Sequence, residues 1–147
     1  MAYKIHCASE WPLDQIAPYM SSILDAMGQL AKRFPKDVTT ASLFQEFLSG
    51  KKTLWLILDD DAFVTMALTS IRVLDPTGKR FATLCDLAGN HVQLYAAELC
   101  AALEAWAEKN DAEPEIYGRK GWEPLLKQFG YRPHATLYRK IEVGYGQ

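Results

Sequence analysis

Apolar residues in the first third of the chain recur at steps of three and four positions. After Pro12, which suits the first turn of a helix, this spacing predicts a long helix that ends at Phe34, before Pro35. A second helix is predicted over residues 39–48 and should stop at Gly50. Both helices should lay an apolar face on a core. The stripe of the first helix consists of Ile16, Met20, Ile23, Met27, Leu30 and Phe34.

The middle of the chain carries the patterns of β-strands. Residues 54–58 form a short apolar run, residues 62–74 are rich in β-branched side chains, and residues 81–87 close an antiparallel meander. A short first strand is predicted over residues 3–8. The aspartates at 59–61 lack the spacing of a calcium loop, so we expect a solvated hairpin tip and no metal.

The last third alternates between helices and strands. The patterns predict a helix over residues 91–109, a strand over 114–117, a helix over 122–129 and a last strand over 132–143. Residues 144–147 then form a short C-terminal tail. No repeat, linker or low-complexity stretch interrupts the pattern, so residues 1–143 should form a single domain.

The fold class that follows is α/β (α+β), with a central mixed, mostly antiparallel sheet flanked by about four helices. The chain has 147 residues, 49% hydrophobic and 23% charged, which is ordinary for one globular domain. A net charge of −2 without a basic stripe argues against direct nucleic-acid binding. The three cysteines show no C-x-x-C spacing, and no apolar run reaches membrane length, so we expect synthesis and folding in a cytoplasm without membrane contact.

The order of these elements resembles the GNAT acetyltransferase family, most strongly over residues 53–142. Residues 103–108 are similar to the family's central helix, and residues 125–131 to its penultimate helix and turn. The resemblance implies the GNAT fold. An active member holds acetyl-CoA with a glycine-bearing loop that opens the central helix, because backbone N–H groups there face the pyrophosphate.

In this chain the corresponding loop departs from the family pattern. With Trp106 aligned to the central helix, Leu94 stands where a glycine belongs and His91 replaces Gln or Arg, although Ala96 is acceptable. The family's general acid, a tyrosine, corresponds to Leu126, which cannot donate a proton. The degenerate loop comprises Gly89, Asn90, His91, Leu94 and Ala96.

These departures favour a non-enzymatic GNAT-like domain that acts through protein contacts, without cofactor or catalytic residues. Residues 118–122 and 130–131 resemble small GNAT-like proteins of tailed bacteriophages, which implies a structural or accessory component of the virion. The alternative is an acetyl-CoA-dependent N-acetyltransferase with an atypical cofactor loop, using Glu98 or a water as general base. A small inhibitor or host-modifying protein is a third interpretation, without a sequence feature to support it.

Arg119 and Trp122 are the candidate interface residues. Arginine and tryptophan are favoured at interface hot spots, and a guanidinium can bind a carboxylate or phosphate. In the competing interpretation, Gly118 and Gly121 shape a turn and Trp122 fills the core. The expected partner is a protein, either another virion protein or a second copy of the chain. The three histidines lack metal-ligand spacing.

Overall fold

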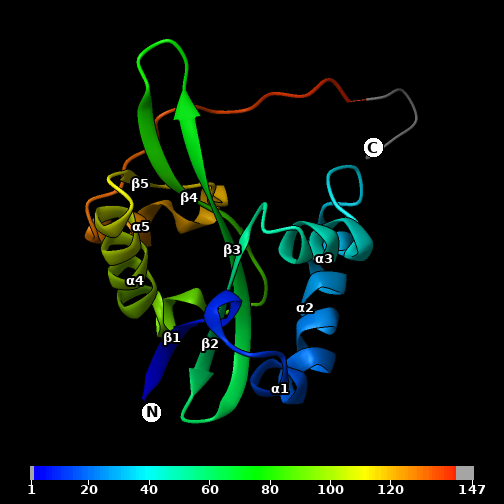
Figure 1. The fold of residues 1–147 in the computed structure, drawn as a ribbon. Coiled ribbons are helices and arrows are strands. Elements are labelled where there is room, and N and C mark those ends of the chain that lie inside the picture. Colours follow the sequence, from blue (N-terminus) through cyan, green and yellow to red (C-terminus); the bar gives the residue numbers. More distant parts are fainter. Residues whose placement is uncertain (1, 142–147) are drawn as a thin grey trace. The chain divides into compact units, whose positions relative to one another are not determined.

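The computed structural model describes residues 2–141, and its chain divides into two compact units (Figure 1). The first unit, Met1–Tyr117, contains the sheet and the four helices α1 to α4. The second, Gly118–Gln147, contains a 3₁₀ turn, Lys120–Trp122, and the helix α5, Glu123–Gln128. None of the helices within residues 2–141 is long and apolar enough to cross a membrane.

The sheet has five strands in the order β1-β2-β3-β4-β5, and all neighbours are antiparallel except β4 and β5, which are parallel. The prediction of a mixed, mostly antiparallel sheet is confirmed. Most of the meander follows the predicted bounds, because the turn residues between its strands interrupt the apolar pattern. The strands are β1 Tyr3–Cys7, β2 Thr53–Asp59, β3 Ala62–Leu74, β4 Lys79–Leu87 and β5 Glu113–Ile116.

Helices cover both faces of the sheet (Figure 1). The helices α2, Met20–Arg33, and α3, Thr40–Leu48, lie on one face, and α4, Ala96–Lys109, lies on the other. On the first face, a cluster of buried apolar side chains packs beneath these helices. Its buried members include Ile23, Met27, Leu30, Leu43, Leu54, Leu56, Met66 and Leu68.

The long helix predicted before Phe34 is divided in the structure. The helix α1, Leu13–Ile16, is followed by a 3₁₀ turn at Ala17–Tyr19, and only then does α2 begin. Pro18 explains the division, since proline has no N–H to continue the helical ladder and suits a new first turn. The other residues of the apolar stripe still face the core despite this break. Phe34, which caps α2, is the exception and is 38% exposed.

Thr39 caps the N-terminus of α3. The Ser42 N–H donates to Thr39 Oγ1 and the Thr39 N–H donates to Ser42 Oγ, each at 2.9 Å. This reciprocal capping box satisfies two donors that the first turn would otherwise leave open. Leu43 is fully buried, in line with the apolar face predicted for this helix, whereas Leu48 is 57% exposed at the end of the helix.

The helix α4 begins later than predicted. His91 has a left-handed backbone (φ 60°), and Val92–Leu94 form a 3₁₀ turn before the α-helix starts at Ala96.

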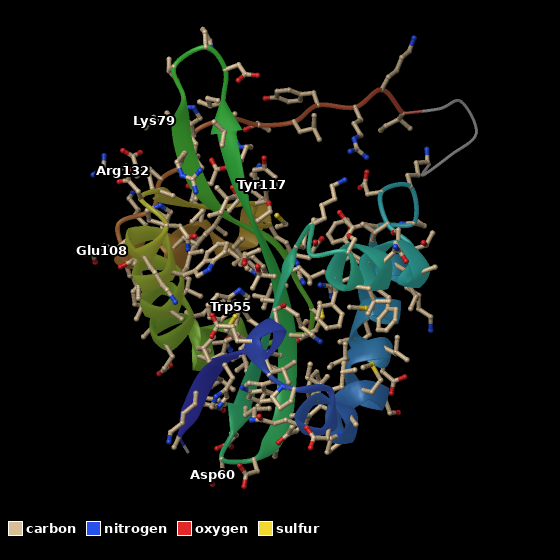
Figure 2. All side chains as sticks on the ribbon, viewed as in Figure 1. Trp55, Asp60, Lys79, Glu108, Tyr117 and Arg132 are labelled. Atoms are coloured by element: carbon tan, nitrogen blue, oxygen red, sulfur yellow. The ribbon has the colours of Figure 1, made fainter. Side chains whose placement is uncertain are left out.

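The Trp106 ring of α4 packs edge-on against Trp55 of β2, with ring centres 5.8 Å apart, and Trp55 Nε1–H donates to Thr69 Oγ1 at 2.8 Å. In Figure 2, Glu108 projects from the outer side of the same helix, and Asp60 lies at the tip of the β2–β3 hairpin.

The predicted last strand is wrong for the residues that the structure describes. Residues 132–141 form no strand and are all exposed, with Leu137 at 76% and Tyr138 at 88%. Alternation describes the two faces of a strand, but a strand also needs a hydrogen-bonded neighbour, and no such neighbour pairs with residues 132–141. Residues 142–143 of this prediction lie outside the described residues.

Candidate functional site

The edge of β4 becomes open partway along the strand. The parallel pairing with β5 runs from Phe81 and Glu113 to Leu84 and Ile116, and ends where Tyr117 N–H donates to Leu84 C=O at 3.0 Å. No strand of the first unit pairs with residues 85–87 on this side. Within the first unit, the backbone groups on that edge of β4 therefore have no strand partner, and an extended ligand can pair with such an edge.

A β-bulge lies at the same place. In the register with β3, Asp86 pairs with Leu68 and Leu84 pairs with Thr69, so Cys85 is an extra residue without a partner. Simple alternation would place Asp86 on the α4 face together with Leu84. The bulge instead turns the Asp86 side chain to the opposite face of the sheet, toward α3. Bulges commonly redirect a side chain in this way.

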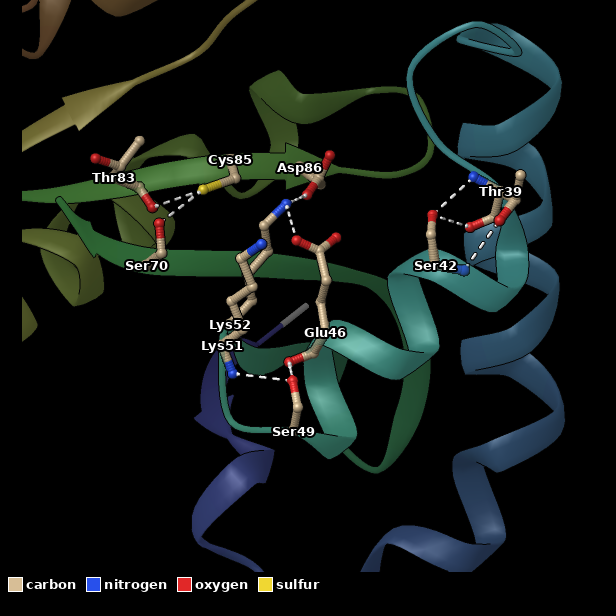
Figure 3. Close-up of polar contacts among 10 residues, drawn as sticks. All are labelled: Thr39, Ser42, Glu46, Ser49, Lys51, Lys52, Ser70, Thr83, Cys85 and Asp86. Atoms are coloured by element: carbon tan, nitrogen blue, oxygen red, sulfur yellow. Dashed lines mark hydrogen bonds and ion pairs between the residues drawn. The ribbon is translucent and has the colours of Figure 1, made fainter.

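Five polar residues gather on the α3 side of this bulge (Figure 3). Lys52 Nζ lies 3.0 Å from Asp86 Oδ2 and 3.3 Å from Glu46 Oε2, and all three side chains are 20% exposed or less. Ser70 Oγ and Cys85 Sγ are 3.2 Å apart in a hydrogen bond. We call this group the polar strip: Glu46, Lys52, Ser70, Cys85 and Asp86.

The surroundings of Lys52 and Cys85 shift the pKa of both side chains. Burial lowers the pKa of Lys52, but the carboxylates of Asp86 and Glu46 outweigh that effect, so the pKa is raised and the ammonium is retained. Burial raises the pKa of the Cys85 thiol, against the lowering effects of Ser70 and Lys52. Cys85 is therefore a neutral thiol, which is a poor nucleophile.

Beside the strip, an ion pair connects β3 to β5 across β4. Arg72 donates to both carboxylate oxygens of Glu115, at 2.8 and 2.9 Å, and the Thr83 hydroxyl donates to Glu115 Oε1 at 2.6 Å. Bidentate pairs of this kind are geometrically specific. The pair secures β5 to the sheet just before β5 parts from β4.

The residues of the predicted cofactor loop lie between β4 and α4. Gly89 has φ 88°, and a Cβ there would approach Thr65 Oγ1 to 3.1 Å, so glycine is required by both backbone and packing. Asn90 and His91 are exposed, Leu94 is 53% exposed, and Ala96 is buried at the first position of α4. The loop thus joins the open part of β4 directly to a helix N-terminus.

The N-terminus of α4 has open donors. No side-chain hydrogen bond caps it, and the first helical bond runs from Leu99 N–H to Tyr95 C=O. The N–H groups of Leu94 and Tyr95 already donate to the His91 and Val92 carbonyls, so the open donors are those of the first helical turn, residues 96–98. Two buried polar atoms beside it, Tyr95 Oη and Glu98 Oε2, lack a hydrogen-bond partner among the described residues. Burial raises the pKa of Tyr95 to about 12, so this phenol stays protonated.

The structure also places the other predicted residues. Within the second unit, the Arg119 guanidinium carbon lies 5.0 Å from the centre of the Trp122 ring, a cation–π contact, and Trp122 is half-buried. Glu98 lies on α4 and so on the opposite face of the sheet from the polar strip. Within residues 2–141, no three His, Cys, Asp or Glu side chains are placed to hold a metal ion.

Sequence reasoning missed the polar strip. Its members come from α3, the start of β2, β3 and β4, so no local motif unites them. One signal was present: an aspartate within the apolar stretch that ends β4. An ionised side chain at an apparently buried strand position requires a partner, and Lys52 is that partner.

No protein-family model matches the sequence, and a search of curated proteins finds no match. Solved structures do match. An acetyl transferase from Pyrococcus furiosus aligns over 96% of this chain and 100% of its own, with a TM-score of 0.68 and 15% identity. Glucosamine-6-phosphate N-acetyltransferase from Arabidopsis thaliana covers 96% of this chain and 99% of its own, with a TM-score of 0.67 and 11% identity.

A third match, an acetyltransferase from Clostridium acetobutylicum with acetyl-CoA, covers 95% of both chains, with a TM-score of 0.62 and 10% identity.

These neighbours correct two predictions made from the sequence. The prediction of a non-enzymatic virion component is contradicted by neighbours that are named as acetyltransferases. The prediction of no cofactor is contradicted by the neighbour with acetyl-CoA. Both predictions rested on the residues of a single loop and on Leu126, whereas an open strand edge and a helix N-terminus can bind a ligand through their backbone. At this level of identity the likeness establishes the fold: the chain has the fold of the GNAT acetyltransferases.

Proposed function

We propose that the chain is an acetyl-CoA-dependent N-acetyltransferase with an atypical cofactor loop. The observation that carries the proposal is the coincidence of three features at one place. The open edge of β4, the bulge at Cys85 and the uncapped N-terminus of α4 lie within residues 85–98.

The open edge and the helix N-terminus fit different parts of the cofactor. The pantetheine arm contains amide groups, which pair with strand backbone as a neighbouring strand would. The pyrophosphate is an anion, for which N–H groups at a helix N-terminus are suitable donors. Ala97 lies in this first turn and is exposed, so its N–H is positioned to bind such a group.

The atypical residues of the cofactor loop should weaken binding of the acetyl-CoA phosphates. Leu94 occupies space that glycine would leave to the ligand, and residues 88–98 contain no Lys or Arg. The Glu98 carboxylate in the first turn of α4 adds a repelling charge. We therefore expect acetyl-CoA to be held mainly through its pantetheine arm. When bound, acetyl-CoA supplies an activated thioester carbonyl to an amine on the α3 side of the sheet.

Replacing Ala97 by proline tests this cofactor site. Proline is tolerated in the first turn of a helix but removes one N–H, so acetyl-CoA affinity should fall about 10- to 100-fold, as for the loss of one charge-assisted hydrogen bond. Calorimetric titration measures the change. Ala97→Ser keeps the N–H and should bind as the wild type does. Equal affinity in the proline variant would remove the helix N-terminus from the site.

Three finer predictions remain proposals. The first is that residues 1–143 act as one domain. The second is the resemblance of residues 118–122 and 130–131 to proteins of tailed bacteriophages. The third is that Arg119 and Trp122 contact a protein partner, which their cation–π contact supports by presenting two hot-spot residue types together. Trp122→Ala that leaves the unfolding midpoint unchanged but abolishes association would support the interface.

A further inference from the structure

The net charge of −2 conceals a division of charge between the two units. Residues 1–117 contain ten Lys and Arg against sixteen Asp and Glu, which gives a net charge of −6. Residues 118–147 contain six against two, which gives a net charge of +4. The prediction against nucleic-acid binding rested largely on the charge of the whole chain, in which these contributions nearly cancel. That small net charge does not exclude a polyanionic ligand for the second unit.

The positive charges of the second unit lie at its surface. Four of its cationic side chains are exposed and form no ion pair within the described part of the chain: Lys120, Lys127, Arg132 and Lys140. Among residues 118–141, Glu123 is the one acidic residue. These four cations are therefore not neutralised within their unit, whereas Lys52 and Arg72 in the first unit are paired with carboxylates.

An extended segment carries part of this charge. Residues 132–141 contain neither helix nor strand and are all exposed, and Figure 1 shows them as an extended stretch. Pro133 favours extended conformations for the backbone of Arg132. From Arg132 to Lys140 the segment can span about 27 Å, which corresponds to several nucleotides at a rise of about 3.4 Å each. It is therefore long enough to follow the backbone of a nucleic-acid strand.

An aromatic ring lies among these cations. Tyr138 is 88% exposed and is followed directly by Arg139 and Lys140. An exposed aromatic ring is a platform on which an unpaired base can stack, whereas the bases of a duplex are already stacked on one another. An acidic protein would attract the cations but has no such use for the ring. The combination of charge and ring therefore favours a single strand of nucleic acid over a duplex and over an acidic protein.

We propose that Lys120, Lys127 and the segment 132–141 form a binding surface for single-stranded nucleic acid. The exposed cations bind phosphates without regard to sequence, and the Tyr138 ring stacks on a base. The inference is independent of the proposed transferase function, because it uses neither the cofactor loop nor the polar strip.

Fluorescence anisotropy with the full chain and labelled oligonucleotides tests the surface. The probes are oligo(dT), oligo(U) and a duplex, each about 12 nucleotides long, within the range of known single-strand sites. We expect micromolar affinity for a single strand, at least about fivefold tighter than for the duplex. Preference for oligo(dT) identifies DNA as the ligand, and preference for oligo(U) identifies RNA. Equal or tighter binding of the duplex would overturn the proposal.

The salt dependence of binding measures the number of phosphate contacts. If three to four phosphates are neutralised, affinity should fall about 20- to 50-fold between about 50 and 200 mM salt. Arg132→Gln combined with Lys140→Gln removes two contacts, so affinity at about 0.1 M salt should fall about 25-fold and the salt dependence should become shallower. Lys32→Gln combined with Arg33→Gln is the matched control, because these two exposed cations end α2 in the first unit. An equal loss in the control would mean that total charge alone decides binding and would overturn the proposed surface.

Substitution of Tyr138 tests stacking separately from charge. Tyr138→Ala should weaken binding about fivefold or more, with the salt dependence unchanged, and Tyr138→Phe should bind as the wild type does. All substituted side chains are exposed, so the urea midpoints of the variants should match the wild type. Wild-type affinity in Tyr138→Ala would remove the ring from the surface and with it the preference for a single strand.

Two competitors test the other polyanions that a basic surface attracts. Polyglutamate and phosphatidylserine vesicles should displace labelled oligo(dT) only weakly. Displacement by polyglutamate at the same concentration as unlabelled oligo(dT) would assign the surface to an acidic protein, and equal displacement by the vesicles would assign it to an anionic membrane. Either result would overturn the nucleic-acid proposal. Acetyl-CoA is absent throughout, so these outcomes and those for the proposed function are obtained independently.

Discussion

The sheet face that α2 and α3 cover carries different kinds of side chain on the two sides of β3. Under α2, the side chains of β2 and β3 are apolar and fully buried, with Leu54, Leu56, Met66 and Leu68 all at 0% exposure. Toward β4, the same face carries the polar strip, which is shielded but charged. The first region can be explained by stability alone, whereas the second contains charges that a purely structural core would not need.

This difference predicts that substitutions in the two regions should affect different properties. A change in the apolar region should reduce the free energy of unfolding and leave ligand binding by the folded protein intact. A change in the polar strip should alter chemistry more than stability.

Leu56→Ala should lower the free energy of unfolding by about 2–5 kcal/mol, because it removes buried methyl groups and leaves a cavity. Urea denaturation measures the change. Leu13→Ala is the control, since Leu13 is 77% exposed and its truncation should have little effect. If the folded fraction of Leu56→Ala lost acetyl-CoA binding, the two regions would not be separable.

Lys52→Met should lower the free energy of unfolding by about 1–3 kcal/mol, because two shielded carboxylates lose their shared cation. Lys51→Met is the control: Lys51 is exposed, and its backbone N–H makes the hydrogen bond to Ser49. Adding Glu46→Gln to Lys52→Met should restore part of the lost stability in the same urea experiment. No restoration would mean that the charges of the strip do not act on one another.

On the α4 side, alkaline pH should destabilise the protein through Cys100. Burial raises the pKa of this thiol to about 11 from the ordinary 9.0, so the folded state keeps a proton that the unfolded state releases. Stability should therefore fall as the pH rises from about 9 to 11, by about 1 kcal/mol at pH 10 relative to pH 7. Thermal denaturation of Cys100→Ala should show a smaller loss over this interval. An equal loss in both proteins would assign the effect to other groups.

The sequence predicts the fold well where local signals agree with packing. Thr39 and Ser42 cap α3 through a motif that lies within four residues, and the β2–β3–β4 meander follows from alternation and turn residues. Prediction fails where a single residue outweighs the pattern, as Pro18 does between α1 and α2. Prediction also fails for residues 132–141. Their alternation of apolar and polar residues fits the two faces of a strand, but the sequence pattern does not show whether a neighbouring strand is present to pair with them.

The site was largely hidden from the sequence. The resemblance points to residues 89–96 as the cofactor loop, but it judges them by their side chains, whereas backbone N–H groups do not depend on side-chain identity. The polar strip depends on a one-residue bulge, which reverses the face of Asp86, and on a lysine that lies 34 residues away in the chain. Alternation alone would place this aspartate on the wrong face of the sheet.

Calorimetric titration of the full chain with acetyl-CoA tests the central claim most directly. The account predicts one binding site per chain with a dissociation constant in the micromolar range, corresponding to about −8 kcal/mol. Coenzyme A without the acetyl group should bind in the same range, because the site contacts the pantetheine arm and the phosphates. Absence of binding at millimolar acetyl-CoA would contradict the proposed transferase function.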